Sequence, residues 1–454
     1  MTNKTTLSKL ATDPSCMDDY DPNAMSVSQA RAFIAQFLQP ISETENVKTM
    51  QALGRVLAID VISPCNVPNH NNSAMDGYAF KFSEGIKIIK VIGTAFAGKP
   101  FEGVVNAGEC VKIMTGAVIP TGADTVVMQE RIAIKSDCIT LLEVPIKGAN
   151  VRMAGEDLEI DQTVLAKGHA LKPADLGLIA SLGVGEVNVY RKLKVAFFST
   201  GDELVSVGKK LEEGQIYDSN RYTIFGMLSR LGVQISDLGV VPDKPDLLEK
   251  TLLKAASEND VVITSGGVSV GEADYMKALL AEHGQVLFWK INMKPGRPLA
   301  YGKIQNAHYF GLPGNPVSAM VTFYQFVQPA LQAISGAAYR AVPVFNVQCT
   351  EAIKKTTGRT EFQRGILFEE AQNGHIVWKV KPLPNQGSGV LSSMSAANCF
   401  IVLDETIGNC EAGAIVKVQT LDSFIWAYIL KLILHNYNSL VDISQSIAVI
   451  MVII

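Results

Sequence analysis

Between residues 192 and 336, short continuous apolar runs alternate with longer segments of helical spacing. The run KVAFFS at 194–199 is typical of a strand buried on both faces of a sheet. The pattern then predicts a helix at 220–231, a strand at 234–241, a helix at 246–257 and a strand at 260–264. Such alternation favours a doubly wound parallel sheet, which binds ligands at the carboxyl ends of its strands.

The pattern changes on both sides of this region. Short β-branched runs separated by Gly and Pro turns occupy residues 86–144 and return after Ala341, which predicts two small β-rich domains. Helical patterns at 26–37 and 170–182 flank the first of them, with Ser26 or Ser28 as an N-cap of the earlier helix. A β-rich domain inserted into a helical and extended domain explains this order.

The predicted fold class is therefore multi-domain α/β plus β. It combines a doubly wound α/β domain with an inserted β-rich domain, a helical/extended linker domain and a C-terminal small β domain. The expected divisions are a flexible tail at 1–24, the discontinuous helical/extended domain at 25–65 and 150–190, the inserted domain at 66–149, the α/β domain at 191–337, the C-terminal β domain at 338–422 and an apolar tail at 423–454. Each apolar run of that last tail is shorter than the roughly 18 residues of a spanning helix, so we expect no membrane span.

Composition and charge narrow the class of protein. The 454 residues are 48 % hydrophobic and 19 % charged, which allows large cores and suggests about three domains. A net charge of −4 argues against a general nucleic-acid binder. The seven cysteines form no CxxC pair, there is no HExxH motif, and the first residues do not resemble a signal peptide. These features predict a cytoplasmic protein without a zinc site.

A glycine-rich segment, TSGGVSVGEAD at 264–274, follows a predicted buried strand. Gly266 and Gly267 would let backbone N–H groups approach an anion, although two glycines also serve a plain strand-to-helix turn. The segment contains a GxSxG match in which Ser269 would be an acyl nucleophile, with His283 or His308 as its partner. A phosphate site, a structural turn and an esterase therefore all remain open.

Positive charge gathers in KINMKPGRPLAYGK at 290–303, which carries Lys290, Lys294, Arg297 and Lys303. Lysine and arginine donors suit a phosphate or another oxyanion. A solvated surface loop is the alternative, but the Pro-Gly-Arg-Pro core favours a shaped loop. The rigid turn GLPGNPVS at 311–318 leads into an apolar helix, where Ser318 either donates to an anion or caps the helix.

Carboxylates follow several of the predicted strands. Asp202 and Glu203 follow the first strand and Asp243 follows the next, while Asp218 lies in YDSN and Asp274 ends the glycine segment. Carboxylates opposed to lysines and a phosphate nest are what Mg²⁺-assisted phosphoryl or adenylyl transfer requires. Each of them alone is more often a helix cap or a salt-bridge residue.

Taken together, these motifs resemble those of the MoeA family of molybdopterin molybdenumtransferases, which is related to the E domain of gephyrin. The resemblance covers residues 25–420. It rests on NSAMDGYA (72–79), MTGAVIPTGAD (114–124), STGDEL (199–204), YDSN (217–220), SGGVSVGEADY (265–275), KPGRP (294–298), LPGNPVS (312–318) and GRTEFQRG (358–365). A single motif of this kind is weak evidence, whereas the whole set in the family's order is specific.

The resemblance implies a homodimer of four-domain subunits that converts adenylylated molybdopterin and molybdate, with Mg²⁺, into molybdenum cofactor and AMP. Asp76 and Thr115 would enter the active-site cleft from one subunit, facing the α/β and terminal β domains of the other. Glu203, Asp243 and Asp274 would handle the metal and the adenylyl phosphate, with Asp243 and Asp274 as metal ligands. Gly266, Gly267 and Ser269 would then lie beside phosphate.

The resemblance also implies a group that holds molybdate, consisting of Lys294, Arg297, Pro298, Ser318, Arg364 and Ser393, with Lys290 as a further cation for the substrate. Molybdate is a tetrahedral dianion, so lysine, arginine and hydroxyl donors are chemically apt. The chain departs from the family pattern at 69–71, which reads Asn-His-Asn in place of an aromatic residue and an Asp. It also has Arg297 where lysine is common, and no family counterpart after about residue 421.

Two alternatives belong to other classes of function. A molybdopterin adenylyltransferase resembles residues 192–336, but the flanking β domains favour the molybdenumtransferase. A non-catalytic scaffold like gephyrin would tolerate loss of the active-site carboxylates, whereas Asp76, Glu203, Asp243 and Asp274 are all present. The molybdopterin adenylyltransferase and proteins that mature molybdoenzymes are expected as further partners.

Overall fold

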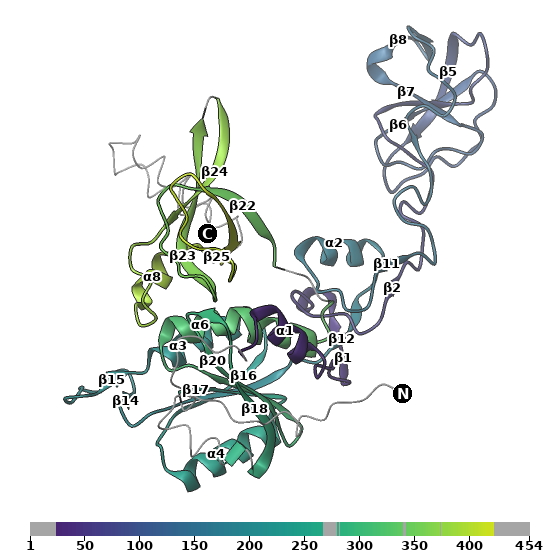
Figure 1. The fold of residues 1–454 in the computed structure, drawn as a ribbon. Coiled ribbons are helices and arrows are strands. Elements are labelled where there is room, and N and C mark those ends of the chain that lie inside the picture. Colours follow the sequence, from purple (N-terminus) through teal and green to yellow (C-terminus); the bar gives the residue numbers. More distant parts are fainter. Residues whose placement is uncertain (1–23, 267–278, 281, 339–341, 373, 422–454) are drawn as a thin grey trace, which may run out of the picture. The chain divides into compact units, whose positions relative to one another are not determined.

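The computed structural model describes residues 24–266, 279–280, 282–338, 342–372 and 374–421 (Figure 1). The predicted tails at 1–24 and 423–454 lie outside these ranges, apart from Ala24. Contacts divide the described chain into two compact units. One is Ser42–Arg191, and the other joins the residues before Ser42 to those that follow Arg191.

A six-stranded sheet forms the centre of the larger unit, in the order β16-β13-β17-β21-β20-β18. The strands are β13 (Lys194–Thr200), β16 (Gln234–Val241), β17 (Val261–Ser265), β18 (Gly284–Lys290), β20 (Pro298–Ile304) and β21 (Ala307–Leu312). The first four in spatial order are parallel, as predicted, but β20 runs antiparallel to both of its neighbours. The predicted parallel sheet is therefore a mixed sheet, because the two residues between β20 and β21 allow only an antiparallel hairpin.

Helices cover both faces of this sheet (Figure 1). They are α3 (Ser219–Arg230), α4 (Pro245–Glu258), and α6 (Pro316–Thr322), which continues through a π-helical turn (Phe323–Val327) into α7 (Gln328–Ile334). Because side chains alternate along β13, Ala196 and Phe198 pack with Leu248 and Leu252 of α4. Val195 and Phe197 pack instead in the core that contains α3, α6 and α7. The predicted helices and strands of this region are thus present.

Helix α1 (Val27–Ala35) begins at the predicted N-cap, where Ser26 and Gln29 form a capping box. Its buried residues Val27, Ala30 and Ile34 follow a helical spacing and join the core of the α/β sheet. Contacts therefore assign α1 to the larger unit, whereas the sequence placed residues 25–65 together. The buried stripe of Val27, Ala30 and Ile34 explains why α1 belongs to the larger unit. The other predicted domain boundaries remain predictions.

The C-terminal strands of the larger unit form a barrel. They are β22 (Val344–Cys349), β23 (Thr360–Gln372), β24 (His375–Pro382), β25 (Cys399–Leu403) and β26 (Ile415–Thr420), with the helix α8 (Leu391–Ala396) between β24 and β25. The pairing order β23-β24-β22-β26-β25 closes because β23 also pairs with β25. The short strand β19 (Met293–Lys294), from the basic segment, adds to the other side of β23. The predicted small β domain is thus a closed barrel with an extra strand from the α/β region.

The smaller unit contains the predicted β-rich stretch. Its six-stranded sheet has the order β7-β4-β6-β5-β9-β8, formed by β4 (Gly77–Phe80), β5 (Ile88–Ala95), β6 (Glu109–Ile113), β7 (Thr125–Met128), β8 (Ile132–Lys135) and β9 (Cys138–Leu141). Three strand pairs accompany it: β1 (Thr44–Lys48) with β12 (Glu186–Tyr190), β2 (Val61–Ile62) with β11 (Thr163–Leu165), and β3 (Asn72–Ser73) with β10 (Val151–Arg152). Helix α2 (Pro173–Ser181) packs beside the first two pairs. The chain thus enters and leaves the β-rich sheet through one small core.

The remaining elements are short. The strands β14 (Leu204–Val205) and β15 (Ile216–Tyr217) pair with each other next to the α/β sheet, and 3-10 turns lie at Thr49–Gln51 and Gln129–Arg131. In the part of the chain that the structure describes, no helix is long and apolar enough to span a bilayer.

Candidate functional site

A pocket of about 380 Å³ lies where the basic segment, the turn before α6 and a loop before α8 meet. It is lined by Met293, Lys294, Pro295, Gly296, Arg297, Pro298, Pro313, Gly314, Asn315, Ser318, Arg359, Gln386, Gly387 and Ser388. The charged side chains of this lining, Lys294, Arg297 and Arg359, are all cationic. The pocket therefore suits an oxyanion.

The basic segment reaches this pocket through a tight turn between β19 and β20. Gly296 has a φ of +92°, and a Cβ there would lie 2.6 Å from Thr322 Oγ1 and 3.2 Å from the Ser318 carbonyl oxygen. Only glycine fits so close to α6 without a shift. The segment predicted as a single shaped loop is thus a turn between strands, since residues 298–303 lie on β20.

The structure brings together Lys294, Arg297, Pro298 and Ser318, as the sequence predicted, but not Lys290. Lys290 ends β18 outside the pocket lining, and its Nζ is buried without a hydrogen-bond partner among the described residues. Ser318 is buried within α6, whose N-cap is Asn315. The alternative that Ser318 caps the helix is therefore wrong.

Arg364 and Ser393 lie behind the pocket wall. Arg364 is 1 % exposed, and its guanidinium donates to Ser393 Oγ at 3.1 Å, to the Asn385 carbonyl at 3.2 Å and to the Gly387 carbonyl at 2.9 Å. Its backbone N–H donates to Gln386 Oε1 at 2.8 Å. Burial lowers the pKa of Arg364 to about 10, so the guanidinium remains charged at neutral pH. Arg364 thus braces the loop at 385–388, which lines the pocket.

Carboxylates lie at the ends of the neighbouring strands β13 and β16. Asp243 accepts a hydrogen bond from Thr200 Oγ1, and its backbone N–H donates to Asp202 Oδ1 at 3.3 Å. The Glu203 carboxylate folds back over Gly201, where a Cβ would lie 2.6 Å from Glu203 Oε2. These groups form an acidic edge next to the glycine turn after β17. Asp218, by contrast, is the N-cap of α3 and accepts from the Arg221 N–H at 3.1 Å.

The glycine segment is described only up to Gly266. A Cβ at Gly266, whose φ is +91°, would lie 2.3 Å from the Thr200 carbonyl oxygen, so the end of β17 requires glycine. Gly267, Ser269 and Asp274 lie outside the described residues, so their predicted roles stay predictions. The described residues contain no group of three or more His, Cys, Asp or Glu side chains placed to hold a metal. The assignment of Asp243 and Asp274 to a metal therefore stays a prediction as well.

Asn220 is a buried residue that the sequence prediction missed. Its Nδ2 donates to Ser265 Oγ and to the Gly314 carbonyl, both at 2.7 Å. It thereby ties the end of β17 to the turn that lines the pocket. The YDSN motif was the available signal, but the prediction used only its aspartate. Arg359, Asn315 and the loop residues Gln386, Gly387 and Ser388 also line the pocket without having been predicted.

In the smaller unit, Asp76 and Thr115 form one hydrogen-bonded pair. Asp76 Oδ1 accepts from the Thr115 N–H at 2.7 Å and from Thr115 Oγ1 at 2.8 Å. The hydrogen bond from the Thr115 backbone N–H, followed by the one from its hydroxyl, holds the pKa of Asp76 below its usual value. Because β4 pairs with β6, the two sequence motifs that carry these residues meet.

Neither histidine nominated for an esterase is a free imidazole. His283 Nε2 lies 2.6 Å from Glu249 Oε1, and His308 Nδ1 lies 3.3 Å from Tyr301 Oη. A glutamate can serve as the acid partner of a triad histidine, whereas a tyrosine hydroxyl cannot, so the contact of His308 does not fit an acyl-transfer triad. Because Ser269 lies outside the described residues, the structure does not test the esterase alternative.

Comparison with known families covers most of the chain in three successive matches. Residues 25–183 match the MoeA N-terminal region (domain I and II), residues 196–333 match a probable molybdopterin binding domain, and residues 346–421 match the MoeA C-terminal region (domain IV). The matches describe a protein of molybdenum cofactor biosynthesis with a molybdopterin-binding region between two MoeA regions. The chain belongs to the MoeA family.

Individual relatives agree with this assignment. The molybdopterin molybdenumtransferase of Haemophilus influenzae is 46 % identical over 87 % of this chain and 98 % of its own length. Gephyrin of Dictyostelium discoideum is 33 % identical over 87 % of this chain and 62 % of its own. The crystal structure of the molybdopterin biosynthesis MoeA protein from Pyrococcus horikoshii is similar with a TM-score of 0.76, at 29 % identity, over 87 % of this chain and all of that one. The predicted resemblance is thus confirmed.

Proposed function

We propose that this chain is a molybdopterin molybdenumtransferase, which inserts molybdenum from molybdate into adenylylated molybdopterin and releases AMP. The cationic pocket at Lys294, Arg297, Arg359 and Ser318 is the observation that carries the proposal. Its donors match a tetrahedral dianion, which carboxylates alone would repel. The match to both MoeA regions supports this function over that of an adenylyltransferase, which corresponds to the middle region alone.

Molybdate is the substrate of this pocket. Arg297 and Arg359 carry planar guanidinium groups that can each grip two oxygens, while Lys294 contributes a point charge and Ser318 a hydroxyl. Pro298 shapes the turn on which these donors lie. Arg364 and Ser393 act on molybdate through the loop that they brace. Lys290 is proposed as a further cation for the organic substrate.

The acidic edge is proposed to handle the adenylyl phosphate. Glu203, Asp243 and Asp274 would act there, with Gly266, Gly267 and Ser269 beside the phosphate. Carboxylate oxygens at two neighbouring strand ends, one of them oriented by Thr200, fit Mg²⁺ as a cofactor. Asp243 and Asp274 would hold this ion, which when bound supplies charge that offsets the phosphate oxygens. Thr200 and Asp202 then serve to fix the orientation of Asp243.

The compartment, the oligomeric state and the protein partners are proposed from the family resemblance. The protein would act in the cytoplasm as a homodimer, with Asp76 and Thr115 of each subunit completing the site of its partner. Its net charge of −4 supports small-molecule substrates over nucleic acid. The molybdopterin adenylyltransferase and proteins that mature molybdoenzymes are the proposed protein partners.

The test is to mix the purified protein with adenylylated molybdopterin, Mg²⁺ and molybdate and to measure AMP by chromatography. We expect AMP release that depends on molybdate. Asp243→Asn should reduce it at least about tenfold, because a proposed ligand of the ion that offsets the phosphate charge is lost. Asp274→Ser should reduce it similarly, whereas the matched control Asp246→Asn, on the exposed start of α4, should keep it. A folded protein that releases no AMP would refute the proposal, and consumption of ATP would indicate an adenylyltransferase.

A further inference from the structure

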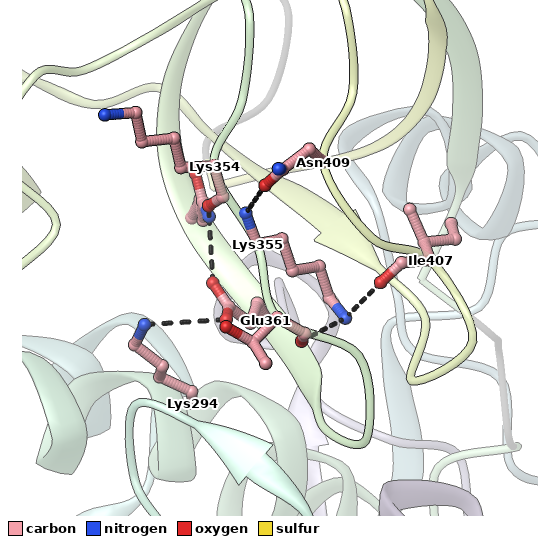
Figure 2. A network of polar contacts seen from close by, with 8 residues as sticks. Lys294, Lys354, Lys355, Glu361, Ile407 and Asn409 are labelled. Carbon is pink, nitrogen blue, oxygen red and sulfur yellow. Dashed lines mark hydrogen bonds and ion pairs between the residues drawn. The ribbon is translucent and has the colours of Figure 1, made fainter.

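A buried carboxylate lies directly beside the cationic pocket. In the parallel ladder between β19 and β23, Lys294 is paired with Glu361, and Lys294 Nζ lies 3.5 Å from Glu361 Oε1 (Figure 2). The Glu361 side chain is 5 % exposed, whereas that of Lys294 is 57 % exposed. One partner is therefore embedded in the barrel and the other lies on the pocket rim.

Glu361 is held in place from the barrel side. Gln363 Nε2 donates to Glu361 Oε2 at 2.8 Å and to the Lys354 carbonyl at 3.1 Å. Lys355 shares the network, with its Nζ donating to the Ile407 carbonyl at 2.7 Å and its backbone N–H to Asn409 Oδ1 at 2.9 Å (Figure 2). Burial lowers the pKa of Lys355, and the Glu361 carboxylate opposes this shift. The hydrogen bond from Gln363 thus holds the Glu361 carboxylate in one position.

Two negatively charged groups can pair with the Lys294 ammonium: the Glu361 carboxylate and an oxyanion bound in the pocket. An ion pair with a half-exposed lysine contributes little free energy, since solvent screens it and the long side chain loses freedom. Molybdate carries twice the charge of a carboxylate and meets the ammonium together with two guanidinium groups. Entry of the oxyanion can therefore draw the ammonium away from Glu361.

We propose that Glu361 is a positioning residue that keeps the Lys294 ammonium at the pocket rim and competes with molybdate for it. Glu361 thereby sets the molybdate affinity below what the cations alone would give. The inference rests on the proposed function, because it takes molybdate as the ligand of the pocket. It concerns Glu361 alone, since Lys294 is already part of the proposed site.

The test is equilibrium binding of molybdate by calorimetry to the full-length protein. Glu361→Gln removes the competing charge and keeps the side-chain shape, so we expect binding about threefold to fivefold tighter. Loss of packing alone would not tighten binding. Lys294→Met should weaken binding, and Glu361→Gln added to it should change affinity by less than about twofold, since the two residues act as a coupled pair. Glu370→Gln, which removes a carboxylate paired with Lys379 further along β23, is the matched control and should leave affinity unchanged.

Three results would overturn the inference. Glu361→Gln could leave the affinity unchanged or weaken it, or it could tighten binding equally with and without Lys294, which would indicate direct repulsion of the anion. If Glu361→Gln does not fold, Glu361→Asp takes its place, because its shorter side chain draws the charge back from Lys294 and should also tighten binding. Absence of molybdate binding by the wild-type protein would instead refute the proposed function, and with it the inference.

Discussion

At the scale of single residues, His308 couples the stability of the α/β unit to pH. This residue of β21 is 6 % exposed, and burial together with the nearby Lys303 lowers its pKa to about 4, against an opposing contribution from Asp260. The folded state therefore resists protonation of His308, while the unfolded chain accepts a proton near the ordinary pKa of 6.5. The stability that His308 contributes is complete above that ordinary pKa and is lost as the pH falls towards about 4.

We therefore expect His308→Gln to flatten the fall in unfolding free energy between these two pH values. Between these two pH values, the wild type should lose about 2 to 3 kcal/mol more unfolding free energy than the variant. Urea unfolding at a series of pH values measures it. His375→Gln changes an exposed histidine on β24 and serves as the control. Parallel pH profiles for His308→Gln and the wild type would contradict the assignment.

Residues within motifs were predictable, whereas residues without one were not. Lys294, Arg297, Pro298 and Ser318 lie in two motifs that the sequence marked by charge and by turn-forming prolines, and the structure places them in one pocket. Gln386, Gly387 and Ser388 line the same pocket from a loop that no motif indicates. Their place depends on hydrogen bonds to Arg364, which is distant in sequence, so local patterns carry no sign of it.

At the scale of elements, the loop at 385–388 depends on a single buried guanidinium. Arg364 spreads its donors over Ser393 Oγ and two loop carbonyls, which suits a planar fork and not an ammonium. We expect Arg364→Lys to lower the unfolding free energy by about 1 to 3 kcal/mol, because buried acceptors lose their donors. Molybdate binding should weaken about tenfold, since the loop no longer closes the pocket wall. Urea unfolding and calorimetry measure the two effects.

Ser393→Ala is a milder change to the same hydrogen-bond network around Arg364. It removes the bond from Arg364 Nε and the bond that Ser393 Oγ donates to the Val390 carbonyl at 2.6 Å, but it leaves the two guanidinium bonds to the loop. Stability should therefore fall by about 1 to 2 kcal/mol, and molybdate affinity should change less than in Arg364→Lys. A loss of affinity in Arg364→Lys at full stability would show instead that the guanidinium contacts molybdate directly. That outcome would return Arg364 to the role implied by the resemblance.

Elements with a strong periodic pattern were predicted closely, and those set by a distant partner were not. Strand β16 has the bounds that its sequence pattern predicts, and α3 and α4 differ from their predictions by a residue at each end. The antiparallel direction of β20 was missed, because the basic segment was interpreted as one loop. The ladder between β19 and β23 was missed as well, since a strand of two residues has no periodicity and its partner lies more than sixty residues away.

At the scale of the whole molecule, the chain divides its proposed catalytic residues between two compact units. Asp76 and Thr115 belong to Ser42–Arg191, whereas Lys294 and Asp243 belong to the larger unit. The sequence alone connected them only through the family resemblance, which implies that each site draws on two subunits of a homodimer. Closed two-fold dimers of this kind contain two equivalent sites.

This proposal predicts complementation between two inactive variants. Asp76→Ala and Lys294→Met, co-expressed with different tags in equal amounts, should form half of their dimers as mixed pairs. In a mixed pair one site carries both substitutions and the other carries neither, so AMP release should recover to about a quarter of the wild-type rate. If all catalytic residues of a site came from one chain, every site in the mixture would carry a substitution and no activity would return. Dimers isolated with both tags should reach about half of the wild-type rate, which separates a shared site from residual activity of either variant.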